Sequence, residues 1–134
     1  FFAALLRAKD RARQRARGKE YVSRYLVRVR DRVVLVKTAD VDWIEAADYY
    51  VTLHAGPESY LLRRSLAEIE AELDPRQFIR VHRSAIVNID RVKEMHSLFR
   101  GDSLIVLRDG TNVRLSRARR EEFERRLKEP RSVF

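Results

Sequence analysis

The densest group of side chains able to do chemistry is Arg80-Val81-His82-Arg83-Ser84, which lies beside an apolar run. Two arginines, an imidazole and a hydroxyl within one short segment can bind anions or hydrogen-bond to a polar partner. An arginine guanidinium can fork onto guanine O6 and N7, or it can clamp a phosphate. The segment therefore fits a nucleic-acid contact, and a solvated loop is the competing interpretation.

Two further polar insertions interrupt apolar segments. Asp48-Tyr49 separates two short alternating runs, so it is either a plain two-residue hairpin tip or a contact site. Ser116 is the predicted N-cap of a final helix whose first turn is basic, with Arg117, Arg119 and Arg120. Backbone N–H groups at the start of a helix favour anions, and these arginines strengthen that preference.

The residues that catalysis or metal binding would need are missing or scattered. His54, His82 and His96 form no pair with the spacing of helical metal ligands, and neither a phosphate-binding glycine loop nor a nucleophile elbow is present. The sequence has no cysteine, which excludes disulfides and thiolate metal sites. Asp40 and Asp42 are explained as loop and cap residues. We expect no enzyme activity, no metal and no cofactor.

The positive charge of the chain is unevenly distributed. The 134 residues carry a net charge of +9, which favours polyanionic partners, nucleic acid before an anionic membrane surface. Residues 1–19 hold seven basic side chains against Asp10 alone, a net charge of +6, and the rest of the chain therefore carries only +3. The net charge is therefore a weak argument that the folded part binds nucleic acid, and the case depends on where its arginines lie.

Apolar side chains recur with a period of two along most of the chain, which predicts short β-strands. Turn signals at Asp31-Arg32 and Asp109-Gly110 predict two hairpins, and Phe78 to Val92 alternates apolar and polar residues but is interrupted by His82-Arg83-Ser84, so no strand is assigned there. The predicted strands cover residues 25–29, 33–37, 43–47, 49–54, 59–64, 92–95, 104–107 and 113–115. The fold class is therefore mainly β, a β-rich α+β domain.

One or two short helices complete the predicted domain. Ser65-Leu66-Ala67-Glu68 matches a capping box, and the apolar stripe Leu66, Ile69 and Leu73 follows before Pro75 ends the helix. The final helix after Ser116 places Phe123 and Leu127 on one face.

The first 19 residues differ from the rest. Leu5, Ala8, Ala12 and Ala16 recur at helical spacing among arginines, and Gly18 is a plausible helix stop. We interpret residues 1–19 as the end of a preceding domain with a basic helical linker, and residues 20–130 as the folded domain. No secretory signal and no run of about 20 apolar residues is present, so we expect a cytoplasmic protein.

The segment from Phe78 to Asp90 resembles the central signature of the LytTR DNA-binding domain; it reads Phe-Ile-Arg-Val-His-Arg-Ser-Ala-Ile-Val-Asn-Ile-Asp. The likeness continues through Asp109-Gly110 to Val113-Arg114-Leu115-Ser116-Arg117, and it extends upstream to Val41-Asp42-Trp43-Ile44-Glu45-Ala46. It covers residues 20–128 in the right order and spacing.

The resemblance implies an elongated fold of stacked small antiparallel sheets that binds duplex DNA through loops in successive major grooves, without a recognition helix. It assigns base contacts to Tyr49, Arg83 and Arg117. It assigns contacts with the DNA backbone to Asp48, Arg80, His82, Ser84, Ser116, Arg119 and Arg120. Tyr49 departs from the family and the residue at position 83 varies within it, so the resemblance does not supply the target sequence.

Residues 1–17 also resemble the last helix of a bacterial receiver domain. This likeness implies the output domain of a two-component response regulator that controls transcription. A histidine kinase would act on a receiver domain absent from this chain, and the full-length protein would bind repeated DNA half-sites as a homodimer, without a membrane partner.

Two other functions compete with this interpretation. The first is a non-catalytic protein- or membrane-surface interaction module with the basic helical arm 1–19. The second is an RNA-binding β domain, which would present aromatic pairs on a sheet face for base stacking. Tyr49, Tyr50 and Tyr60 are too few and too dispersed to favour it.

Overall fold

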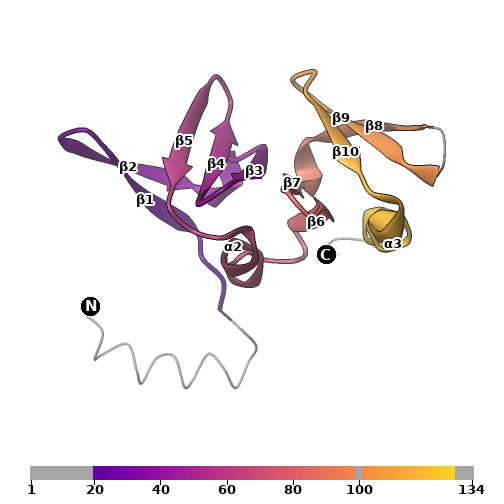
Figure 1. The fold of residues 1–134 in the computed structure, drawn as a ribbon, viewed down its shortest axis with the longest axis horizontal. Helices are drawn as coiled ribbons and strands as arrows, with labels where there is room; N and C mark the ends of the chain where they lie inside the picture. Colours follow the sequence, from indigo (N-terminus) through magenta and orange to yellow (C-terminus); the bar gives the residue numbers. More distant parts are fainter. Residues whose placement is uncertain (1–19, 99–100, 129–134) are drawn as a thin grey trace, which may run out of the picture.

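A computed structural model describes residues 20–98 and 101–128 of the chain. Within these residues three antiparallel sheets follow one another along the long axis, with two α-helices packed against them (Figure 1). This arrangement confirms the mainly β expectation with stacked small sheets and two short helices, whereas the predicted linker helix 1–19 lies outside the described residues. The strands are β1 Arg24–Val29, β2 Arg32–Lys37, β3 Trp43–Ala47, β4 Tyr50–Ala55, β5 Glu58–Leu62, β6 Phe78–His82, β7 Ala85–Asn88, β8 Val92–Ser97, β9 Ser103–Leu107 and β10 Asn112–Leu115.

Strands β1 and β2 form a separate two-stranded hairpin. Alternate side chains, among them Tyr25, Val27 and Val36, are buried, because a strand presents successive residues to opposite faces. The turn is Arg30-Asp31, one residue earlier than predicted, and Arg30 has a φ of 53°. The prediction of Asp31-Arg32 was wrong because Arg32 pairs with Val29 as the first residue of β2.

The central sheet has five strands in the order β5-β4-β3-β7-β6. Strand β7 lies between β3 and β6, and all four of its residues are buried. Ile86 packs into one hydrophobic core, whereas Ala85 and Val87 pack into a second core on the other side of the sheet. Strand β7 could not be assigned from the sequence because a strand buried on both faces loses its apolar–polar alternation.

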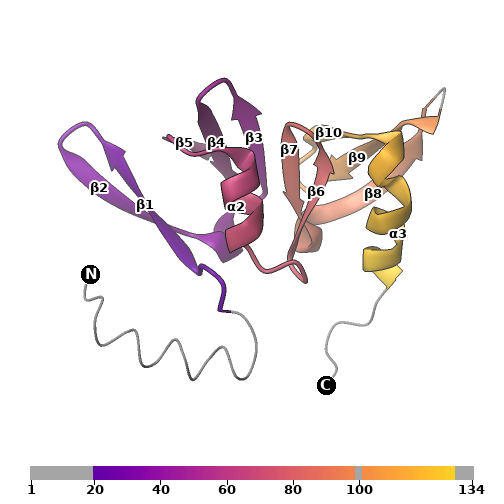
Figure 2. The same cartoon turned by 60° about the horizontal axis from the view of Figure 1, so that its bottom comes forward.

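Helix α2 (Leu66–Glu72) covers the first core. The predicted capping box is present: the hydroxyl of Ser65 accepts a hydrogen bond from the N–H of Glu68, and the Glu68 carboxylate accepts one from the N–H of Ser65. Leu66, Ile69 and Leu73 are buried as predicted. Figure 2 shows α2 between the β1–β2 hairpin and the central sheet, and a hydrogen bond from Tyr25 to Glu72 (3.0 Å) joins helix and hairpin.

Strands β8, β9 and β10 form the third sheet, and α3 (Arg120–Lys128) packs beside it. Phe123 and Leu127 lie one turn apart on the same face of α3 as predicted; Phe123 is fully buried in the second core, whereas Leu127 is 38% exposed. Ser116 does not cap α3, because a 3-10 turn, Arg117–Arg119, intervenes and the Ser116 side chain makes no capping hydrogen bond. The basic segment is therefore a turn that leads into the helix.

Candidate nucleic-acid interface

The tip of the β3–β4 hairpin consists of Asp48 and Tyr49, as predicted for a two-residue turn. Asp48 has a φ of 50°, a left-handed conformation that aspartate tolerates better than most residues. The side chain of Tyr49 projects from this turn, and the residue is 78% exposed. An exposed phenol at a hairpin tip can donate a hydrogen bond or pack on an apolar group of a partner.

The β6–β7 hairpin presents Arg83 and Ser84 at its tip. The pairing of β6 with β7 shifts between Arg80 and His82, which is a β-bulge directly before the turn. A bulge bends a strand and redirects the side chains that follow it. Arg83 is exposed, and no carboxylate among the described residues pairs with its guanidinium, so this charge is directed to solvent.

The side chain of Arg80 holds the β6–β7 tip in shape through hydrogen bonds to its backbone. Its guanidinium donates to the carbonyl oxygens of His82 (3.3 Å) and Arg83 (2.5 Å), and it pairs with Glu70 of α2 (3.1 Å). Since Arg80 is largely occupied by these contacts, its first role is to position Arg83. Arg80 was predicted to contact the DNA backbone, and no local pattern pointed to its ion pair with Glu70.

His82 and Ser84 hydrogen-bond to each other across the same turn. The Ser84 backbone N–H donates to His82 Nδ1 (3.3 Å), and the Ser84 hydroxyl lies 3.0 Å from the same nitrogen. An Nδ1 that accepts a hydrogen bond carries no proton, so the neutral ring holds its N–H at Nε2. His82 thus offers an Nε2 donor beside Arg83.

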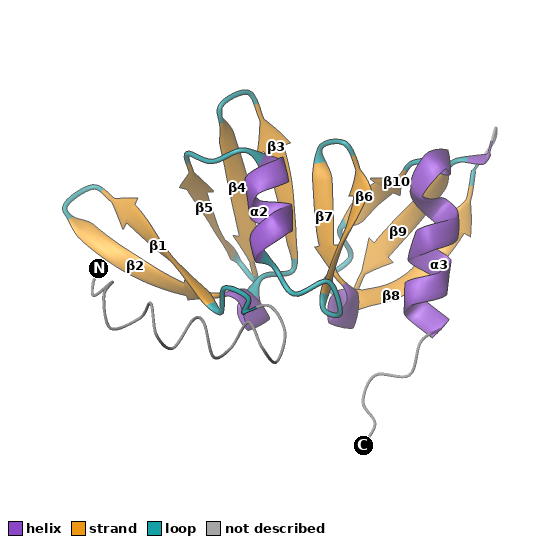
Figure 3. Cartoon of the chain, turned by 90° about the horizontal axis from the view of Figure 1, so that it is seen from below, coloured by secondary structure: helices purple, strands orange, loops and turns teal. Residues whose placement is uncertain are grey.

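Strand pairing brings the two hairpin tips together. Strand β3 pairs antiparallel with β7 up to Glu45 and Ala85, and the N–H of Ala46 donates to the carbonyl of Ser84 (2.9 Å) just beyond the last pair. The two hairpin tips therefore lie at the same end of the central sheet, where β3 ends and β7 begins. Figure 3 shows them side by side, with the N-terminal end of α3 on the same side of the molecule.

The third segment is attached to the second hairpin through the backbone. The N–H of Ser116 donates to the carbonyl of Val81 (2.9 Å), which lies within the bulged end of β6. This bond places Arg117 next to the Arg83 turn. Of the other basic residues here, Arg119 forms no ion pair among the described residues, whereas Arg120 pairs with Glu124 (3.0 Å).

Gly101 and Asp102 determine the position of Arg117, and the sequence identified them only as a turn. Gly101 has a φ of 84°, and a Cβ added there would lie 2.6 Å from Arg117 Cδ. A hydrogen bond from the Arg114 side chain, and a further one from the Arg117 backbone N–H, lower the pKa of Asp102. Asp102 therefore stays charged close to Arg117 and orients its segment.

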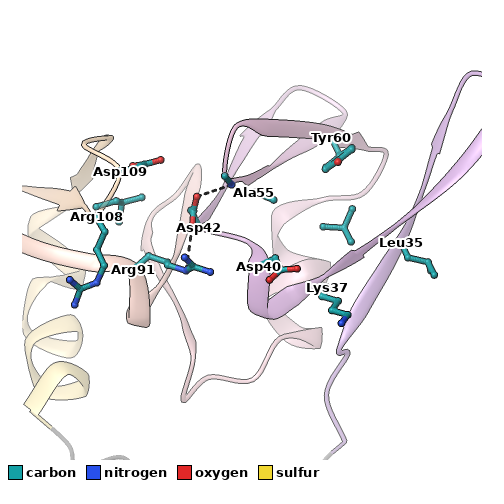
Figure 4. A pocket seen from close by; sticks show the side chains of 12 residues that line it. Leu35, Lys37, Asp40, Asp42, Ala55, Tyr60, Arg91, Arg108 and Asp109 are labelled. Atoms are coloured by element: carbon teal, nitrogen blue, oxygen red, sulfur yellow. Dashed lines mark hydrogen bonds and ion pairs between the residues drawn. The ribbon is translucent and has the colours of Figure 1, made fainter.

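A surface pocket of about 580 Å³ lies elsewhere, between the β1–β2 hairpin and the β9–β10 turn. Figure 4 shows Asp42 at its centre, where the carboxylate accepts a hydrogen bond from the N–H of Gly56 (3.0 Å) and pairs with Arg91 (3.4 Å). These contacts agree with the interpretation of Asp42 as a loop residue. None of the side chains nominated for DNA contact lines this pocket.

Within the part of the chain that the structure covers, no helix is long and apolar enough to cross a membrane.

Comparisons with known proteins agree with the resemblance seen in the sequence. The profile of the LytTr DNA-binding domain family matches residues 31–128. The sensory transduction protein LytT of Bacillus subtilis is 31% identical over 99 residues, which make up 74% of this chain and 41% of LytT. The transcriptional regulatory protein LytR of Staphylococcus aureus is 26% identical over 98 residues, 73% of this chain and 40% of LytR.

A solved structure supports the same assignment. The LytTr DNA-binding domain of a Bacillus cereus response regulator superimposes with a TM-score of 0.74 and 27% identity, and the match covers 81% of this chain and 99% of that domain. The chain spans about two fifths of the length of the curated relatives that it matches. It belongs to the LytTR DNA-binding domain family.

Proposed function

We propose that the chain recognises specific duplex DNA sequences by inserting three loops into successive major grooves. The loops are the β3–β4 tip, the β6–β7 tip and the turn before α3. The observation that supports this most is their common side: strand pairing and the Ser116–Val81 hydrogen bond hold Tyr49, Arg83 and Arg117 on one side of the scaffold. A rigid scaffold with side chains fixed at loop tips suits sequence readout.

Each side chain has a separate task in this proposal. Arg83 and Arg117 read base edges, and a good bidentate pair with guanine contributes about 1–3 kcal/mol of discrimination. Tyr49 hydrogen-bonds to a base or packs on a thymine methyl group. Contacts with the DNA backbone set the register of the protein on the duplex. They come from Asp48, His82, Ser84, Ser116, Arg119 and Arg120, and from the N–H groups of Arg80 that are not used in holding the turn.

The full-length protein, in this proposal, is a two-component response regulator. Residues 1–19 end a preceding receiver domain on which a histidine kinase acts, and that domain brings two copies together as a homodimer. One LytTR domain has a small footprint, so tight binding needs two copies on repeated half-sites. A signal that brings two copies together would therefore raise the occupancy of the DNA site.

The test is selection from a pool of random duplexes at about 0.15 M salt, where specific and non-specific binding separate. We expect an enriched motif with repeated half-sites. Arg83→Ala and Arg117→Ala should each relax the preference at different positions of that motif. Binding without enrichment that neither substitution alters would contradict the proposal.

Arg76→Ala is the matched control. Arg76 is an arginine with an 83% exposed side chain, and it precedes β6 at the end opposite the Arg83 turn. The motif selected by this variant should equal that of the unsubstituted chain. A control variant that relaxed the motif as strongly as Arg83→Ala would show that a general loss of charge, and not base readout, causes the effect.

A further inference from the structure

The β1–β2 hairpin carries an unusual share of the positive charge. Between Arg24 and Lys37 five basic side chains stand against Asp31 alone, a net charge of +4. All residues after Lys19 together carry only +3, so the described domain outside this hairpin is not basic. A polyanion would meet a positively charged surface of the domain here.

The basic side chains of the hairpin have no ion-pair partner within residues 20–98 and 101–128. Arg24, Arg28, Arg30, Arg32 and Lys37 form no ion pair with any described residue. Elsewhere many arginines pair with carboxylates, as Arg64 does with Glu72, Arg114 with Asp102 and Arg126 with Glu122. The hairpin thus gathers five cations without an ion pair among the described residues on two neighbouring strands.

Two of the hairpin's cations lie close enough to repel each other. Arg24 and Lys37 lie directly opposite each other in the strand pairing, at the base of the hairpin. Like charges at directly opposed positions destabilise a strand pair. An external anion would relieve this repulsion as well as neutralise the cations nearer the turn.

Three arginines surround the turn and point in different directions. Arg28 is exposed on the outer face of β1, whereas Arg32 pairs with Val29 on the inner face. Arg30 occupies the turn itself with a φ of 53°. Figures 2 and 3 show the hairpin at one end of the molecule, with its tip on the side that carries the β3–β4 and β6–β7 tips.

We infer that the β1–β2 tip is a fourth DNA contact, in which Arg28, Arg30 and Arg32 bind phosphates beyond the outermost base-reading loop. The inference rests on the proposed function for the side of the molecule that faces DNA. Guanidinium groups on a turn can clamp phosphates without reading sequence. The family match begins at residue 31, so Arg28 and Arg30 lie outside the matched segment and Arg32 lies within it.

The test compares the 134-residue chain with the double variant Arg28→Gln/Arg30→Gln. Binding is measured at several salt concentrations on a mixed-sequence duplex and on the selected motif. Each phosphate contact contributes about 0.9 to the slope of log K against log salt, so the slope should become shallower by about 2. Affinity should fall by the same factor on both duplexes, and the selected motif should stay unchanged.

A second duplex localises the contact. When the selected motif is trimmed on the flank beyond the β3–β4 loop, the unsubstituted chain should lose clearly more affinity than the double variant. This pattern follows because the variant keeps only Arg32 of the three arginines that bind the removed phosphates. Sequence preference is a separate readout, so the hairpin contact can fail while base readout by Arg83 and Arg117 holds, and the reverse.

Lys93→Gln/Lys128→Gln is the control, because both lysines are exposed, neither forms an ion pair among the described residues, and they lie on β8 and at the C-terminal end of α3. An unchanged slope in this control supports the contact. An unchanged slope in the Arg28/Arg30 variant, or an equal change in the control, would overturn it. The exposed Leu26–Leu35 pair and the cations around it would then fit an acidic protein partner better than DNA.

Discussion

At the scale of single residues, the position of Arg117 depends on a residue that does not itself reach the partner. Gly101 leaves room for the Arg117 side chain, since any Cβ there would stand 2.6 Å from Arg117 Cδ. Gly101→Ala should therefore displace Arg117 and weaken the sequence preference at the position that Arg117 reads. Selection of duplexes by this variant should give a motif relaxed at one position and unchanged at the position assigned to Arg83.

Gly110→Ala separates this effect from backbone strain. Gly110 also has a positive φ of 95°, but nothing lies within 4 Å of its added Cβ. Both substitutions place alanine in a left-handed conformation and should destabilise the domain by about 1–3 kcal/mol. Only Gly101→Ala should change the motif, and equal motifs for both variants would show that Gly101 does not position Arg117.

At the scale of elements, α2 is short and depends on its N-terminal cap. Ser65→Ala removes the acceptor for the Glu68 N–H and should lower the free energy of unfolding by about 1 kcal/mol. The backbone hydrogen bond from Ser65 lowers the pKa of Glu68 below its usual 4.5. This contribution of Glu68 is therefore complete above pH 4.5 and is lost as the pH falls through its lowered pKa.

Denaturant titrations at neutral and acidic pH would measure both effects. Glu68→Gln should reduce the loss of stability on acidification, and Glu58→Gln, a substitution at an exposed glutamate on β5, should leave that loss as it is. If Glu58→Gln and Glu68→Gln reduced it equally, the capping box would not be the source of the pH dependence.

The same elements show what a sequence can and cannot predict here. The α2 cap and the β3–β4 and β9–β10 hairpins are encoded by neighbouring residues, so local patterns located them. Strand β7 was missed because burial on both faces hides the strand period, and β6 because its alternation is interrupted at the irregular pairing near His82. Ser116 was wrongly predicted to cap α3 because a 3-10 turn looks like a helix start.

The candidate site shows the same division. Its three loops stand out as polar insertions, and the resemblance assigned their residues. Their closeness depends on the pairing of Glu45 with Ala85 and on the bond from Ser116 to Val81. Such distant pairings leave no local trace, and neither do the contacts of Glu70 with Arg80 or of Gly101 with Arg117.

At the scale of the whole molecule, one sheet joins two hydrophobic cores. The first core lies between the β1–β2 hairpin, α2 and the central sheet, and the second lies between that sheet, β8 to β10 and α3. Adjacent residues of β6 and β7 point into different cores: Phe78 and Ile86 into the first, Ile79 and Val87 into the second. Loss of either core therefore removes support from the strands that carry Arg83.

This sharing predicts a single cooperative unfolding transition. Ile69→Ala in the first core should lower the free energy of unfolding by about 2–5 kcal/mol and Phe123→Ala in the second by about 3–5 kcal/mol, because both side chains are fully buried. Each substitution should move the whole transition, recorded together by far-UV circular dichroism and by the fluorescence of Trp43, which packs against the second core.

A two-step transition in Phe123→Ala, with Trp43 reporting before the remaining strands unfold, would show that the cores are independent. The loops would then sit on two units able to move apart, and the spacing of Arg83 from Arg117, on which readout of a fixed sequence depends, would follow from DNA binding and not from the fold. A single transition in both variants would mean that the scaffold sets this spacing before any DNA arrives.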